Sequence, residues 1–230
     1  MSADGGEAAA PAPGASDLEA QHAAARDEAF AYVCNRCSLC CQGKLIQVNP
    51  YEIARLARRV GVSTGQFTAD YTEDGAGARL ARDATDTCVF LGPQGCTVHP
   101  DRPLVCRIYP LGRHVAAEGT ERWTHVAPHP QTKGVYGKDG TIADYIAAQG
   151  ALPFMRAADA YTEWLRSAYR VIDAGDDATS LEAADLLDMD SMIAAHCRET
   201  GADEPLDIEA RMALHLAILA DWLDREGDEG

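Results

Sequence analysis

Seven of the eight cysteines fall within one part of the chain, and four of them stand within eight residues, CNRCSLCC. They are Cys34, Cys37, Cys40, Cys41, Cys88, Cys96 and Cys106, whereas the eighth, Cys197, is remote. Thiols this close in sequence are used as metal ligands, as redox groups or in disulfide bonds, and each use dictates the local structure. The cysteine spacing therefore constrains the fold more than any other feature.

The redox environment separates these uses. The first residues, MSADGGEAAAPAPGAS, contain neither a basic start nor the apolar run of a secretory signal. No stretch approaches the roughly 18 apolar residues of a membrane span. We therefore expect a soluble, cytoplasmic protein without a membrane partner, whose thiols are kept reduced. Buried or disulfide-bonded cysteines are the alternative, but a reducing compartment favours metal ligands.

The charge distribution limits the partners. Lys and Arg number 20 and Asp and Glu 36, which gives a formal net charge of −16. Phosphate backbones repel so acidic a chain, so we expect no nucleic-acid partner. The acidic residues concentrate from Asp173 onward, whereas the cysteine region is mildly basic. The acidic part could dock a basic protein, although the sequence identifies no protein partner.

Apolar periodicity and capping residues predict an α+β fold that is mostly helical. Asn49, Pro50 and Glu52 form a capping-box pattern that starts a helix ending at Gly61. We expect a short strand at 45–48 and hairpins around the turn GPQG and over 113–128. Short helices are expected from Ser63 or Thr64 to about Tyr71 and within 101–108. Longer helices are predicted at 17–32, 151–174, 181–199 and 208–225.

Changes in composition suggest three parts. Residues 1–16 are rich in Ala, Gly and Pro and are expected to be disordered. Residues 17–130 would form a small, metal-stabilised cysteine-cluster domain with short hairpins. Residues 131–230 would form an acidic C-terminal helical region. A chain of 230 residues is long enough for one substantial core, or for a small domain with a helical extension.

The spacing C-x-x-C-x-x-C is the one with which a tight loop holds three thiolates on an iron–sulfur cluster, with a fourth ligand from elsewhere. The same spacing permits a tetrahedral zinc site built from C-x-x-C and a remote pair. Close thiolates repel one another until a cation compensates them. Arg36, Lys44, Arg102 and Arg107 could offset the remaining negative charge of such a site, or could belong to an ordinary solvated surface.

The pattern as a whole resembles the CxxCxxCC cysteine-cluster family (YkgJ-like), which is described as a zinc- or iron-chelating domain. After CNRCSLCC, the shared elements are Cys88 before Phe-Leu, the Gly-Cys pair at Cys96, and an Arg-Pro-x-x-Cys-Arg stretch around Cys106 that ends in Tyr-Pro. The resemblance covers roughly a third of the chain. It implies that these three cysteines and the four of CNRCSLCC are metal ligands. His99 departs from the family, where Tyr is common; it is either a ligand in a Cys-x-x-His arrangement or an ordinary structural histidine.

The sequence thus predicts a metal-binding protein that holds an iron–sulfur cluster or a zinc ion, and of these we favour the [4Fe–4S] type of cluster. Seven thiols exceed one four-ligand site, so either a second site exists or some thiols are spare. No reaction and no catalytic residue can be assigned. The alternative is a metal-dependent enzyme such as a protein lysine N-methyltransferase, because flagellin lysine-N-methylase resembles this family in its cysteine cluster. Against it, no Gly-rich loop for S-adenosylmethionine follows a predicted strand.

Overall fold

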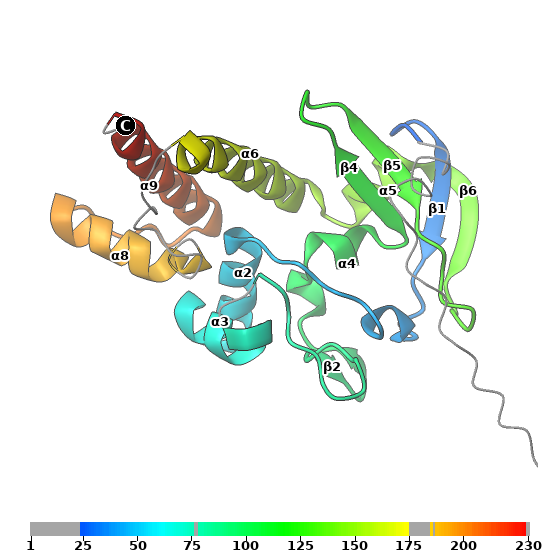
Figure 1. Ribbon diagram of the computed structural model, residues 1–230. Coiled ribbons are helices and arrows are strands. Elements are labelled where there is room, and N and C mark those ends of the chain that lie inside the picture. The colour runs from blue at the N-terminus through cyan, green and yellow to red at the C-terminus, as the bar shows by residue number, and fades with distance from the viewer. Residues whose placement is uncertain (1–23, 76–77, 175–184, 186, 229–230) are drawn as a thin grey trace, which may run out of the picture.

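The computed structural model describes residues 24–75, 78–174, 185 and 187–228 (Figure 1). The strands in these ranges are β1 (Ala29–Val33), β2 (Leu91–Gly92), β3 (Gly95–Cys96), β4 (Leu111–Val115), β5 (Glu121–His125) and β6 (Val135–Thr141). The helices are α2 (Pro50–Val60), α3 (Thr64–Tyr71), α4 (Leu104–Ile108), α5 (Ile142–Ala148), α6 (Leu152–Ala174), α8 (Met189–Thr200) and α9 (Ile208–Asp228). Long helices beside small antiparallel sheets confirm the predicted α+β, mostly helical class.

Local sequence sets the bounds of α2 as predicted. The Asn49 side chain accepts a hydrogen bond from the Glu52 N–H, and the Asn49 N–H donates to the Glu52 carboxylate, both at 3.0 Å. Pro50 occupies the first helical position, and Gly61 follows the helix with a left-handed φ of 84°. The predicted helix α3 is also confirmed, with Ser63 as its N-cap.

The other predicted elements are confirmed in most of their extent. The hairpins β2–β3 and β4–β5, the short helix α4 and the long helices α6 and α9 lie where they were expected. The strand predicted at 45–48 is wrong, because this segment forms only an isolated bridge between Gln47 and Arg79. Helix α8 covers the end of the range predicted for 181–199, of which residues 181–184 and 186 lie outside the described residues.

The helix predicted at 17–32 is wrong in the part that the structure describes. Ala29–Val33 forms β1, which pairs antiparallel with β6. Phe30 and Tyr32 are buried while the residues beside them are more exposed, so one face of the strand packs on the core with a period of two. This packing overrides the helix propensity of the neighbouring alanines. Residues 1–23, including the tail expected to be disordered, lie outside the described residues.

The elements form a helical end and a sheet-rich end (Figure 1). Helix α9 packs against α6 and α8, and α3 packs against α8. The β1–β6 and β4–β5 sheets lie at the opposite end, and α2, α3, α4 and the cysteine segments lie between. Among the helices that the structure describes, none combines the length and apolar character needed to span a bilayer.

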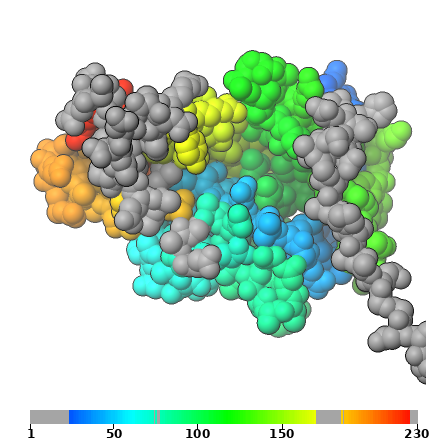
Figure 2. All heavy atoms as spheres, viewed as in Figure 1, coloured from blue at the N-terminus to red at the C-terminus, as the bar shows by residue number. Residues whose placement is uncertain are grey.

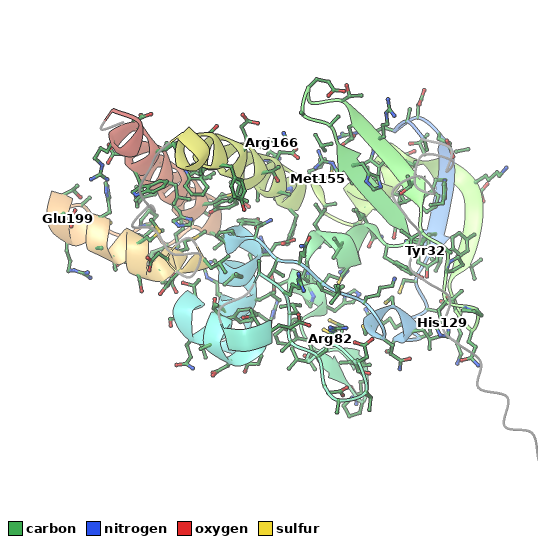
Figure 3. All side chains as sticks on the ribbon, viewed as in Figure 1. Tyr32, Arg82, His129, Met155, Arg166 and Glu199 are labelled. Atoms are coloured by element: carbon green, nitrogen blue, oxygen red, sulfur yellow. The ribbon has the colours of Figure 1, made fainter. Side chains whose placement is uncertain are left out.

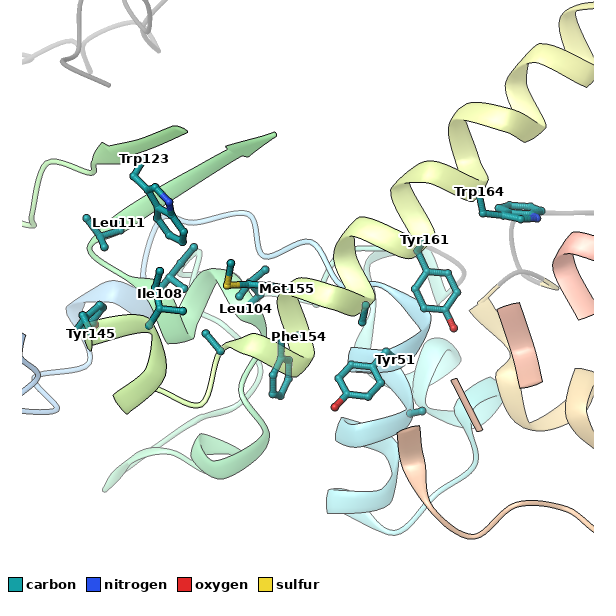
Figure 4. Packing of buried hydrophobic residues seen from close by; sticks show 14 of the residues in the cluster. Tyr51, Leu104, Ile108, Leu111, Trp123, Tyr145, Phe154, Met155, Tyr161 and Trp164 are labelled. Carbon is teal, nitrogen blue, oxygen red and sulfur yellow. The ribbon is translucent and has the colours of Figure 1, made fainter. Parts of the chain in front are cut away.

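Two groups of buried side chains hold this arrangement together. The larger core runs from Trp123 and Tyr145 at the sheets, through Phe154, to Trp164 at the helical end (Figure 4). The smaller core contains Phe67, Leu80 and Phe90, and Cys88, Cys96 and Cys106 pack against it. The larger core draws on residues before and after 130, so the domain division at that point stays a prediction.

Candidate metal centre

One cavity of about 400 Å³ collects all the cysteines predicted as ligands. Its walls include Cys34, Cys37, Cys40, Cys41, Cys88, Cys96 and Cys106, whereas Cys197 is buried in α8. In Figure 3, sulfur atoms gather between the loop that follows β1 and the β2–β3 hairpin. The fold therefore brings together two groups of thiols that are about 50 residues apart in sequence.

The first group lies on a tightly wound loop. Arg36 and Ser38, on either side of Cys37, have left-handed φ angles of 51° and 65°, and residues 39–41 form a 3-10 turn. A left-handed conformation at a non-glycine residue costs roughly 1–3 kcal/mol, so surrounding contacts must hold the loop in place. One such contact is the hydrogen bond at 2.7 Å from the Asn35 side chain to the Lys133 carbonyl.

The second group lies on the segments that close the cavity from the other side. The Cys88 N–H donates to the Cys41 carbonyl at 2.9 Å, which joins the two groups directly. Cys96 belongs to β3 and Cys106 to α4. Gly95 turns the hairpin with a left-handed φ of 99° and faces the Ser38 side chain, so the hairpin packs on the first loop.

The surroundings lower the pKa of some of these thiols and raise the pKa of others. The Cys41 thiol hydrogen bonds to Cys40, and this contact lowers the pKa of Cys40 to about 6 and raises the pKa of Cys41. Backbone N–H groups of Lys133 and Leu39 lower the pKa of Cys37. Burial raises the pKa values of the three thiols in the second group. A metal cation would supply the charge needed to deprotonate those buried thiols.

The four predicted cations lie at this site. Arg36, Arg102 and Arg107 line the cavity, and the Lys44 ammonium lies 3.7 Å from the ring centroid of Tyr109, which also lines it. Arg102 donates to the His99 carbonyl and to the Gln149 side chain, each at 2.7 Å.

Arg107 has a buried donor that no described residue satisfies. Its side chain is 6% exposed, lies over the Phe154 ring at 3.9 Å and donates to the carbonyls of Gln149 and Pro100. Its Nε atom has no hydrogen-bond partner among the described residues. The Nε atom is closed off from solvent and from the cavity, while the Phe154 ring covers the guanidinium.

The sequence did not predict the rest of the wall. Tyr32 from β1, Tyr145 from α5, and Thr132 and Gln149 also line the cavity. Tyr32 packs edge-on against Tyr109 and Tyr145, with ring centroids 6.2 Å and 6.4 Å away. The alternation of the aromatic residues Phe30 and Tyr32 with alanines was the available signal for β1. His99 lines the same cavity with its Nδ1 atom 3.3 Å from the Arg102 guanidinium.

The lining of the cavity is rich in thiols and in positive charge. Within the described ranges, no three His, Cys, Asp or Glu side chains already form a metal site. In the described part of this lining no carboxylate is present, so the fixed charges are those of the arginines.

Comparison with known proteins agrees with the cysteine pattern. The model of the CxxCxxCC family, described as a "putative zinc- or iron-chelating domain", matches residues 33–127. Neither a curated protein nor a solved structure matches the chain significantly. The resemblance predicted from the sequence is thus confirmed for this segment, and a zinc ion or an iron–sulfur cluster fits the family description.

Proposed function

We propose that residues 33–127, the segment that the CxxCxxCC family model matches, bind an iron–sulfur cluster through cysteine thiolates. The observation that carries the proposal is the convergence of seven thiols on one cavity of about 400 Å³. Sulfur ligands are preferred by zinc and by iron–sulfur clusters rather than by the hard cations magnesium and calcium. The choice therefore lies between these two groups.

The cysteine spacing favours the cluster. Cys34, Cys37 and Cys40 follow the C-x-x-C-x-x-C run with which a tight loop holds three thiolates of a [4Fe–4S] cluster. A fourth thiolate would come from Cys88, Cys96 or Cys106, which line the same cavity.

The polar surroundings also suit a negatively charged, sulfur-rich group. A cluster with four thiolates carries net negative charge, and its sulfur atoms accept hydrogen bonds. Arg36, Arg102 and Arg107 line the cavity, and guanidinium groups are hydrogen-bond donors. Arg102 adds positive charge beside Cys40. The residues present therefore fit a bound cluster in charge and in hydrogen bonding.

The chain's own residues would perform distinct tasks in this site. Four of the seven cysteines would supply thiolates, from the loop of CNRCSLCC and from Cys88, Cys96 or Cys106. Tyr32, Tyr109 and Phe90 would limit the access of water. When bound, the cluster would supply a group that can exchange an electron. Thiols that act as metal ligands must be reduced, as they would be in the cytoplasm.

Matched cysteine variants test the proposal. The protein is produced under anaerobic conditions with iron, and iron and acid-labile sulfide are measured per chain. Cys37→Ala removes the central thiol of the C-x-x-C-x-x-C run, whereas Cys197→Ala removes a buried thiol in α8 that does not line the cavity. We expect the first variant to lower the iron content and the second to leave it unchanged. Equal iron content in both variants, or its absence from the unaltered protein, would contradict the proposal.

A further inference from the structure

A second cavity lies next to the cysteine cavity and is larger, at about 950 Å³. It is bounded by α6, the β4–β5 hairpin, α4 and the extended segment 43–46, and we call it the α6 groove. Figure 2 shows the surface hollowed between α6 in yellow and the hairpin in green. Its volume lies at the upper end of the range of roughly 300–1,000 Å³ found for small-molecule sites.

Three exposed aliphatic side chains line the α6 groove. Leu45, Val105 and Val126 line it and are 56%, 44% and 37% exposed. Single exposed aliphatic residues are common on protein surfaces and need no explanation. Three that line one cavity together with buried Leu104, Ile108 and Leu111 give it an apolar wall of the type that binds an apolar ligand.

The charges of the α6 groove leave one cation without a carboxylate partner. Arg113 is paired with Glu121 and Asp159, and Arg166 lies 3.6 Å from Glu163. Lys44, by contrast, forms neither an ion pair nor a hydrogen bond with any residue that the structure describes, and its ammonium lies over the Tyr109 ring. Tyr109 lines both cavities, so Lys44 stands at the inner end of the α6 groove, where the two cavities meet.

We propose that the α6 groove binds an amphipathic monoanion of the long-chain carboxylic acid class. The apolar chain would lie along Leu45, Val105 and Val126, and the carboxylate would pair with Lys44. A half-buried ammonium gains more from an ionic partner than an exposed one does, because water screens the pair less. None of the cysteines lines this groove, so the bound carboxylate would contact Lys44 and not the thiols.

The test titrates the full chain with cis-parinaric acid, a long-chain carboxylic acid whose fluorescence rises in an apolar site. Lys44→Met keeps the length of the side chain and removes its charge, and Lys138→Met is the matched control on exposed β6. We expect about tenfold or weaker binding for Lys44→Met, as for the loss of one charge-assisted hydrogen bond, and unchanged binding for the control.

A second pair of variants tests the apolar wall. Val126→Glu places a carboxylate in the α6 groove, and Val135→Glu makes the same change on β6, where Val135 is 57% exposed. Binding should be lost in the first variant and kept in the second. Absence of saturable binding to the unaltered chain would overturn the proposal, as would equal affinity for the alcohol of the same chain or insensitivity to both Lys44→Met and Val126→Glu.

Discussion

Glu52 connects the start of α2 to the start of α4, the helix that carries Cys106. Its side chain is 3% exposed, and its carboxylate accepts hydrogen bonds from the backbone N–H groups of Asn49 at 3.0 Å and Leu104 at 2.6 Å. Burial raises the pKa of Glu52 to about 7 from its ordinary value of 4.5, although these N–H groups oppose the change. The folded protein therefore binds a proton at Glu52 more tightly than the unfolded chain does.

The sign of the pH dependence follows from this difference in pKa. A carboxyl group whose pKa is raised in the folded state stabilises the fold fully below its unfolded pKa, and this stabilisation is lost as the pH rises through the folded pKa. At about 1.4 kcal/mol per pH unit, the interval between 4.5 and about 7 corresponds to roughly 3 kcal/mol. Glu52→Gln cannot titrate, so it lacks this dependence.

The assay compares the free energies of unfolding of the unaltered protein and Glu52→Gln, from denaturant titrations followed by tryptophan fluorescence. The difference, unaltered minus variant, should fall by roughly 2–3 kcal/mol between about pH 5 and pH 8, because all other titrating groups cancel. Glu118→Gln changes an exposed glutamate and serves as the control. A difference that is the same at both pH values would refute the reasoning about Glu52.

Three further changes have defined outcomes. Asn49→Ala removes the side-chain acceptor that caps α2 and should lower the free energy of unfolding by about 1 kcal/mol, measured by denaturant titration. His215 is fully buried, and burial lowers its pKa to about 4. The free energy of unfolding should therefore fall by roughly 3 kcal/mol as the pH drops from 6.5 to 4. The variant His215→Gln should not show this fall. Phe67→Ala, behind the cysteine cavity, should cost about 3–5 kcal/mol by the same assay.

Features encoded in a few neighbouring residues could be predicted from the sequence. The start and end of α2 follow from Asn49, Glu52 and Gly61, whose side chains and backbone preferences act within one helical turn. The β2–β3 hairpin follows from the turn GPQG. The meeting of the two cysteine groups could also be predicted, because the family resemblance relates segments that are far apart in the chain.

Features that depend on distant contacts could not be predicted. Strand β1 pairs with β6, about 100 residues later, and no local signal in the Ala-rich segment before Ala29 indicates this partner. Tyr145 and Gln149 reach the cavity through α5, whose position depends on packing against β1 and α4. The unpartnered Nε of Arg107 depends on the burial of its whole side chain, which a sequence motif does not reveal.

The most direct test of the central claim is the metal content of the unaltered protein. The chain is purified without oxygen, its absorption spectrum is recorded, and iron, zinc and sulfide are measured in the same sample. We predict a coloured protein with a charge-transfer band at about 400 nm and with iron and sulfide in similar amounts. A colourless protein that contains zinc and no sulfide would contradict the iron–sulfur assignment, and a protein without either metal would contradict metal binding by the cysteine cavity.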